Sequence, residues 1–195
     1  LPLPDVSYAD LSVLTSLKNS TSSEKSVILE GKVGDIAFTK EVDVPAETEV
    51  EVCISAADMP QLRMKNPKLW MPNGYGDPNL YELELRCLEE SEVSDVQTTR
   101  FGVRELSYEL TVDAPSAKGL RIEHNPLADN HLGEILDHRM LRDTLGGLHI
   151  PSLAEGIKVE DLDVIPNDGM NPYLVIKVNG VRIFCRGGNW GMDDM

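Results

Sequence analysis

The side chains best suited to chemistry gather in the last residues of the sequence. A turn signal at Asn179-Gly180 and an apolar run at 181–185 lead to the glycines at 187 and 188. A polar and aromatic group follows, made of Asn189, Trp190, Asp193 and Asp194. This order is typical of a chain that leaves one domain and delivers side chains to the site of the next. We therefore expect the chemistry of the protein to lie beyond residue 195.

A second candidate is the aromatic loop at residues 69–81, which reads Leu-Trp-Met-Pro-Asn-Gly-Tyr-Gly-Asp-Pro-Asn-Leu-Tyr. Proline restricts the backbone, Asn-Gly favours a tight turn, and aromatic rings bury large areas, so the composition favours a structural role. The alternative is a platform on which Trp70, Tyr75 and Tyr81 stack against a sugar ring.

Three polar motifs have weaker claims to a function. His131, Glu134 and His138 could share one face of a helix and hold a metal, but no third ligand is fixed, and a solvated face is favoured. The acidic run at 160–163 lacks the glycine and the spacing of a calcium loop. The triplet Asn19-Ser20-Thr21 matches a glycosylation sequon, a pattern that also arises by chance. We expect no metal site in these residues.

Length and charge exclude several classes of partner. The chain has 195 residues, of which 41% are hydrophobic, and this is enough to bury a core. Its formal net charge of -15 would repel a phosphate backbone and an anionic lipid surface. No apolar run approaches the roughly 20 residues that span a bilayer. We therefore expect no nucleic acid and no membrane as partners.

The two ends and the cysteines complete this picture. Leu1-Pro2-Leu3-Pro4 is typical of a linker, and we expect the chain to be internal to a longer protein. Strand alternation places Cys53 with Glu49 and Glu51 on a polar face, whereas Cys87 falls on an apolar face. Because these two thiols point to different sides, and no CxxC spacing is present, the cysteines are expected to be free.

The elements that must position these residues are mostly short strands. Period-2 alternation with a turn signal about every 8–12 residues predicts an all-β fold, an immunoglobulin-like antiparallel β-sandwich of roughly seven strands. Residues 1–4 are the expected linker, and residues 5–111 and 172–186 form the expected sandwich. Residues 187–195 are expected to begin another domain. The predicted strands lie at 6–17, 26–33, 36–42, 47–54, 81–88, 96–108 and 173–178.

Residues 112–171 break this rhythm and are too long for a structureless connection. We expect a partly helical insertion there. Apolar residues recur at helical spacing, Asn130 can cap the start of a helix, and Gly146-Gly147 can end it. The apolar positions are Leu132, Ile135, Leu136, Met140, Leu141 and Leu145. One amphipathic helix is predicted.

Three motifs in order resemble a known family. They are Leu-Trp-x-Pro-Asn-Gly-Tyr-Gly at 69–76 with Leu-Tyr at 80–81, Phe-Gly-Val-Arg-Glu at 101–105, and Asn-Gly-Val-Arg-Ile-Phe at 179–184 with Arg-Gly-Gly-Asn-Trp at 186–190. Together they resemble the central immunoglobulin-like sandwich of glycoside hydrolase family 2, in particular its β-mannosidase and exo-β-glucosaminidase-like branch. Met71 departs from the second aromatic residue often found after the loop tryptophan.

The resemblance implies a modular enzyme with an N-terminal jelly-roll domain, this sandwich, and a (β/α)8 barrel that carries two catalytic glutamates. The family retains anomeric configuration, which requires an acid/base and a nucleophile about 5–5.5 Å apart. Neither glutamate is expected in this chain, and Glu84 and Glu89 cannot replace them because they belong to a charged strand face and its end. The resemblance therefore implies a non-catalytic domain without cofactor. Its partners would be the barrel and the jelly roll of the same parent chain, with a carbohydrate substrate reached through the parent.

The resemblance also gives the last residues a role. They resemble the first barrel strand, whose C-terminal end lines the active site. Asn189, Trp190 and Asp193 would then contact the substrate in the full-length parent, with Asp194 an equal candidate to Asp193. The structural alternative is that the glycines allow a sharp crossing between domains and that Trp190 only packs against it.

A rival hypothesis is that the chain is an independent carbohydrate-binding or cell-surface interaction module that binds glycan through the aromatic loop. The solvent exposure of Trp70 distinguishes the two hypotheses. A buried ring favours the scaffold, and a flat exposed row of rings favours the binding module.

Overall fold

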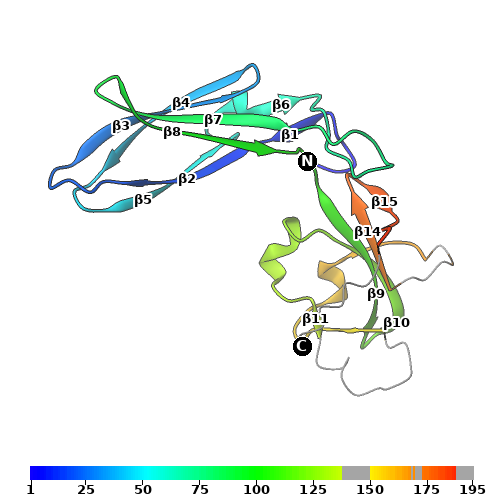
Figure 1. Ribbon diagram of the computed structural model, residues 1–195. Helices are drawn as coiled ribbons and strands as arrows, with labels where there is room; N and C mark the ends of the chain where they lie inside the picture. Colours follow the sequence, from blue (N-terminus) through cyan, green and yellow to red (C-terminus); the bar gives the residue numbers. More distant parts are fainter. Residues whose placement is uncertain (138–149, 168, 170–172, 188–195) are drawn as a thin grey trace, which may run out of the picture. The chain divides into compact units, whose positions relative to one another are not determined.

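The computed structural model describes residues 1–137, 150–167, 169 and 173–187 (Figure 1). The chain forms two compact units, Leu1–Arg104 and Glu105–Met195. Within the described residues, no helix has the length and apolar character needed to cross a membrane.

The first unit contains a four-stranded antiparallel sheet with the order β4-β3-β7-β8. Its strands are β3 (Lys25–Val33), β4 (Ile36–Val44), β7 (Tyr81–Glu89) and β8 (Glu92–Phe101). Alternate residues of β3 are buried and exposed, as a strand with one face on a core requires. Tight turns join β3 to β4 and β7 to β8, and Gly34 in the first of them has a φ of 56°.

A second layer faces this sheet. It consists of the antiparallel pairs β2 (Ser12–Lys18) with β5 (Glu49–Ser55) and β1 (Tyr8–Asp10) with β6 (Arg63–Lys65), the last preceded by a short 3-10 helix, η1 (Pro60–Leu62). Buried residues from both layers form one hydrophobic cluster: Val13, Leu29, Phe38, Val52, Ile54 and Leu62. Two antiparallel layers over a shared apolar core make this unit a β-sandwich, and the all-β prediction is confirmed.

Gly31 allows the aromatic ring at the centre of this core. It lies directly opposite Phe38 in the pairing of β3 with β4. A Cβ atom added at Gly31 would lie 1.9 Å from Cζ of Phe38, so the ring occupies the space that a side chain would need. Phe38 itself is only 3% exposed.

The second unit is built on a separate sheet. The described strands run in the order β11-β12-β9-β10-β13, and β14 pairs with both β9 and β15. The longer strands are β9 (Leu106–Ala114), β10 (Ala117–His124), β14 (Leu174–Val178) and β15 (Val181–Ile183). The short ones are β11 (Leu136–Asp137), β12 (Ser152–Leu153) and β13 (Asp163–Val164), with 3-10 turns η2 (Ala128–Leu132) and η4 (Val159–Asp161).

The apolar core of this unit lies on one face of β9 and β10. Val112 and Ile122 are fully buried there together with Ile135. Leucines and isoleucines from the segments around η2, β12 and η4 pack against them: Leu132, Leu136, Leu153, Ile157 and Leu162. The segment after β10 is therefore folded onto the sheet.

The division of the chain differs from the predicted domain boundaries. Residues 105–111 and 172–186 were expected in the sandwich, but β9 and β14 pair with each other in the second unit. The register joins Leu174 to Leu110 and Val178 to Leu106. Alternation identifies a strand and its inward face, but it does not identify the sheet that the strand joins, and this explains the difference.

The predicted helix in the 112–171 insertion is not found in its described part. Residues Ala128–Leu132 form a 3-10 turn, and the chain then reverses at Gly133, which has a φ of 70°. Leu136–Asp137 is a strand paired with Ser152–Leu153. The apolar spacing arises because Ile135 and Leu136 both pack against the sheet from an extended segment. Met140, Leu141 and Leu145 lie outside the described residues.

All three cysteines belong to the described residues and are free, as predicted. Cys53 is exposed on β5, whereas Cys87 on β7 is partly buried against the sandwich core. The two thiols lie on opposite kinds of face because alternation in each strand puts them there.

Candidate functional site

The aromatic loop of the first unit holds Trp70 partly buried, in contact with the segment around Gly102. Trp70 covers Gly102, whose added Cβ would lie 2.7 Å from Cβ of Trp70. The guanidinium carbon of Arg104 lies 4.5 Å from the centre of the Trp70 ring, a cation–π contact. Trp70 thus contacts both the backbone at Gly102 and a guanidinium group within its own unit.

Backbone bonds fix the loop to the segment that contains Gly102. Trp70 N–H donates to the carbonyl of Val103 at 2.9 Å, and Leu69 forms a parallel bridge with Val103. Within the loop, Met71 N–H donates to Asp77 O at 3.0 Å, and Asn79 Nδ2 donates to Leu69 O at 2.9 Å. Two of the three sequence motifs are therefore the two halves of one packed structure.

The tyrosines of the loop do not continue a row of exposed rings. The hydroxyl of Tyr81 accepts a hydrogen bond from Lys68 N–H at 2.7 Å, and its ring stacks on Phe101 with centroids 5.9 Å apart. Tyr75 is the exposed member, with 38% of its surface accessible. The binding-module hypothesis requires a flat exposed row of rings, whereas Trp70 and Tyr81 are partly buried, so this geometry favours the structural interpretation.

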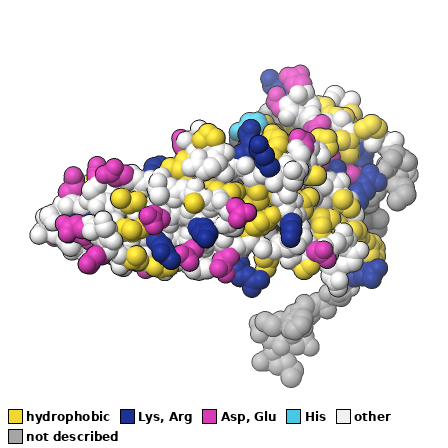
Figure 2. Space-filling model, turned by 90° about the horizontal axis from the view of Figure 1, so that it is seen from above, with side chains coloured by type: hydrophobic (Ala, Val, Ile, Leu, Met, Phe, Trp, Pro, Cys, Tyr) yellow, Lys and Arg dark blue, Asp and Glu magenta, His cyan; other side chains and the backbone are white. Residues whose placement is uncertain are grey.

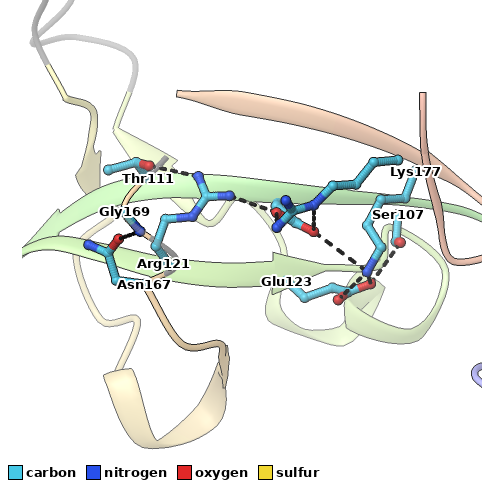
Figure 3. A network of polar contacts seen from close by, with 9 residues as sticks. Ser107, Thr111, Arg121, Glu123, Asn167, Gly169 and Lys177 are labelled. Carbon is cyan, nitrogen blue, oxygen red and sulfur yellow. Dashed lines mark hydrogen bonds and ion pairs between the residues drawn. The ribbon is translucent and has the colours of Figure 1, made fainter. Parts of the chain in front are cut away.

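The second unit contains a buried charged network that sequence analysis missed (Figure 3). Glu109 on β9 is 3% exposed and Arg121 on β10 is 2% exposed. Arg121 Nη2 donates to Glu109 Oε2 at 2.7 Å, and its Nη1 donates to Thr111 Oγ1 at 2.8 Å. Arg182 on β15 adds two bonds to the same carboxylate, each of 2.8 Å.

The network continues to a second carboxylate. Lys177 Nζ on β14 donates to both oxygens of Glu123, at 2.8 and 2.7 Å, and lies 3.8 Å from Glu109 Oε1. Ser107 Oγ donates to Glu123 Oε1 at 2.9 Å. The available signal was the alternation of Ser107, Glu109 and Thr111 along β9, which predicts a polar face but not its burial.

The charges of this network stabilise the ionised form of Glu109. Burial acts to raise the pKa of its carboxyl, but the hydrogen bond from Arg182 and the charges of Arg182, Lys177 and Arg121 outweigh burial and lower that pKa. A carboxylate held in this way serves as a fixed negative charge. It is unsuited to donate a proton near neutral pH.

The remaining polar motifs have structural or solvent-facing positions. In the described residues no group of three or more His, Cys, Asp or Glu side chains could hold a metal ion. His131 contacts the Ala128 carbonyl through Nδ1 at 3.0 Å, and Glu134 is exposed. His138 lies outside the described residues. The acidic run at 160–163 is divided between η4 and β13, with Asp163 exposed.

The asparagine of the sequon, Asn19, is buried, and its side chain binds backbone carbonyls of neighbouring segments. Asn19 is 7% exposed, and its Nδ2 donates to the carbonyls of Ser23, Val44 and Pro45 at 2.8, 3.0 and 3.1 Å. Its Oδ1 accepts bonds from the backbone and hydroxyl of Thr21. The amide nitrogen that a glycan would need is occupied within the fold.

The acidic residues of the outer sheet face form surface pairs. Arg86 Nε donates to Glu84 Oε1 at 2.6 Å, and Lys25 pairs with Glu89. Lysine and arginine side chains are interspersed among acidic ones on the face in Figure 2 rather than gathered into one patch.

The predicted substrate contacts lie outside the described residues. They are Asn189, Trp190 and Asp193.

A two-layer antiparallel sandwich in which Trp70, Gly102 and Arg104 are in contact defines the first unit as an all-β domain. The family described as "Glycosyl hydrolases family 2" matches residues 3–104, which nearly coincide with the first unit. The chain therefore belongs to glycosyl hydrolases family 2.

Relatives within this family are known. The exo-beta-D-glucosaminidase of Streptomyces avermitilis is 31% identical over 113 residues, 58% of this chain and 12% of that protein. Beta-mannosidase B of Emericella nidulans is 42% identical over 41 residues, 21% of this chain and 5% of that protein. The crystal structure of the Amycolatopsis orientalis exo-chitosanase is similar with a TM-score of 0.48 and 22% identity, over 61% of this chain and 13% of that one. The chain thus spans about an eighth of the length of the first relative.

Proposed function

We propose that this chain is a non-catalytic β-sandwich part of a family 2 glycosidase and that it scaffolds the catalytic barrel of a longer parent protein. The parent reaction would be retaining exo-hydrolysis of a β-linked sugar. The family match supports the glycosidase class, and the small share of each relative that the chain covers supports a larger parent.

The observation that carries the scaffold role is the packing of Trp70. Its side chain contacts Gly102 and lies under the guanidinium group of Arg104, and its backbone is bonded to Val103. A ring used in this way stabilises the corner where the loop meets the segment that follows β8. The face of the ring that Arg104 covers is not open for stacking a sugar.

The carboxyl groups also support a non-catalytic role. A glycosidase acid needs a raised pKa, as in the two-carboxylate mechanism. Hydrogen-bonding partners lower the pKa values of the carboxyl groups of Asp5, Asp10, Glu109 and Asp113. The buried one, Glu109, is bonded to two arginines.

In the proposed parent, the partners of this chain are a (β/α)8 barrel and an N-terminal jelly-roll domain. Asn189, Trp190 and Asp193 would contact the non-reducing sugar at the mouth of that barrel. The activities of the relatives, exo-beta-D-glucosaminidase and beta-mannosidase, indicate which substrates to test first.

The first experiment measures hydrolysis by the 195-residue chain. Aryl β-glucosaminide, β-mannoside, β-galactoside and β-glucuronide should give no turnover, because the carboxylate pair is supplied by the parent. Turnover that is proportional to the chain and survives repurification would overturn the non-catalytic proposal.

The second experiment separates scaffold from binding module with two matched variants. Trp70→Ala should destabilise the chain by about 3–5 kcal/mol, whereas Tyr75→Ala should change stability by no more than about 0.5 kcal/mol. Calorimetry with chitosan and mannan oligosaccharides should show no micromolar binding to the unmodified chain. Micromolar binding that Tyr75→Ala abolishes would establish the binding module instead.

A further inference from the structure

The sequence contains the dipeptide Asn-Gly twice, at 73–74 and at 179–180, in opposite surroundings. The first lies in the loop of the first unit, and the second lies in the turn between β14 and β15. Because the reacting dipeptide is the same, a difference in its chemistry must come from the fold or from the flanking residues, which are Pro72 and Tyr75 in the first copy and Val178 and Val181 in the second.

In the first copy, both the asparagine side chain and the glycine backbone are accessible to solvent. Asn73 and Gly74 are exposed, and neither the Asn73 carboxamide nor the Gly74 N–H has a hydrogen-bond partner among the residues that the structure describes. Tyr75 N–H donates to Pro72 O at 3.0 Å and closes the turn around them. Apart from Gly74 itself and its two chain neighbours, no heavy atom of the described residues lies within 4 Å of the place that a Cβ would take at Gly74, whose φ is 86°.

In the second copy, hydrogen bonds to Glu105 hold the asparagine in place. Asn179 is 8% exposed. Its N–H donates to Glu105 O at 2.9 Å, and its Oδ1 accepts a bond from Glu105 N–H at 2.8 Å. Gly180 is as unobstructed as Gly74, since its Cβ position also has no described heavy atom within 4 Å beyond the glycine and its chain neighbours. The two copies therefore differ at the carboxamide and not at the glycine.

We propose that Asn73-Gly74 is a site of spontaneous deamidation and that the fold of the second unit protects Asn179-Gly180 from the same reaction. The Gly74 nitrogen gives its proton to water or hydroxide and attacks Cγ of Asn73. The new C–N bond replaces the Cγ–Nδ2 bond, and the carboxamide nitrogen leaves as ammonia after taking up a proton.

Hydrolysis of the cyclic imide formed in this way consumes one water. Addition of water to one imide carbonyl gives aspartate, and addition to the other gives isoaspartate. Both products place a new carboxylate in the loop. Isoaspartate also adds a carbon to the backbone of the turn, which changes the path between Pro72 and Tyr75.

The protection of Asn179 has a definite physical cause. Attack requires its carboxamide to rotate away from Glu105, which leaves the buried Glu105 N–H without its acceptor. An unsatisfied buried donor is unfavourable enough to slow the reaction by about tenfold or more. Asn73 loses no such bond when its side chain rotates.

The test is peptide mapping by mass spectrometry after the folded 195-residue chain has been incubated at mildly alkaline pH. Enzymatic methylation of isoaspartate marks one product, and the conversion of amide to carboxylate marks both. Asn73 should react at least about tenfold faster than Asn179 in the folded chain. The variant Asn73→Gln should lose the signal at that position and retain the slow one at Asn179.

A parallel incubation in denaturant separates the fold from the local sequence. There, both copies should react at comparable rates. Equal rates in the folded chain would overturn the proposal, as would an Asn73 that reacts only after denaturation. A slow Asn179 in denaturant would assign the difference to its sequence neighbours and remove the role of the fold.

Discussion

The contact between Gly31 and Phe38 allows the sharpest stability prediction. In Gly31→Ala, the new methyl group would lie 1.9 Å from Cζ and 2.4 Å from Cε1 and Cε2 of Phe38. The ring cannot turn into solvent, because it is 3% exposed and packs in the cluster that contains Leu29 and Ile54. Either the ring or the two strands must therefore shift.

The magnitude follows from two opposing effects. Replacing glycine by alanine within a regular element gains about 0.5–1 kcal/mol when there is room for the methyl group. Forcing an extra methyl group into a packed core costs about 1–3 kcal/mol. The distance of 1.9 Å lies far inside van der Waals contact, so overpacking should dominate. We expect Gly31→Ala to lower the free energy of unfolding by about 1–2 kcal/mol.

The assay is urea unfolding of the chain, with a double-mutant cycle as its control. Phe38→Leu alone should destabilise, because it leaves a cavity. In Gly31→Ala/Phe38→Leu, the methyl group enters that cavity, and the double variant should be more stable than additivity predicts by about 1 kcal/mol. An unchanged stability of Gly31→Ala, or strictly additive single effects, would show that the ring does not cover the glycine.

The lowered pKa of Glu109 means that its contribution to stability is present above the unfolded value of about 4.3 and is lost as pH falls through the folded value. Glu109→Gln should therefore destabilise the chain at pH 7 by about 3–5 kcal/mol and flatten the acid limb of a melting-temperature profile, whereas the more exposed Glu123→Gln should do less. An unchanged acid limb in Glu109→Gln would refute this assignment. Asn19→Ala should destabilise by about 1–3 kcal/mol because three carbonyls lose their donor, a loss that thermal unfolding would measure. In the full-length parent, Asn189→Ala and Trp190→Ala should each lower kcat/KM by at least about tenfold, and normal kinetics would remove these residues from the substrate site.

The sequence by itself was sufficient for the character of the elements. Alternation in 47–54 and 81–88 gave the correct inward faces, so that Cys53 is exposed and Cys87 is partly buried. The all-β class and the family followed from the same local signals and from short motifs. These properties depend on side-chain period and turn chemistry, which neighbouring residues fix.

The sequence predicted only part of the structure of the loop motifs. Composition favoured a packed Trp70, and the structure supplies its partners, Gly102 and Arg104. Those partners lie more than thirty positions away in the sequence. No local pattern encodes such a contact, because it depends on how the segment that follows β8 lies beside the loop.

Only the tertiary structure decided which strands share a sheet. Leu174–Val178 has the alternation of a sandwich strand, yet it pairs with β9, because register and partner depend on the whole polar and apolar face presented to it. Burial of Glu109 and Arg121 has the same origin, since each charge is tolerated only where the other compensates it. The contrast between Asn73 and Asn179 shows the same limit. One dipeptide is exposed and the other is bonded to Glu105, because hydrogen bonding and burial are properties of the folded chain.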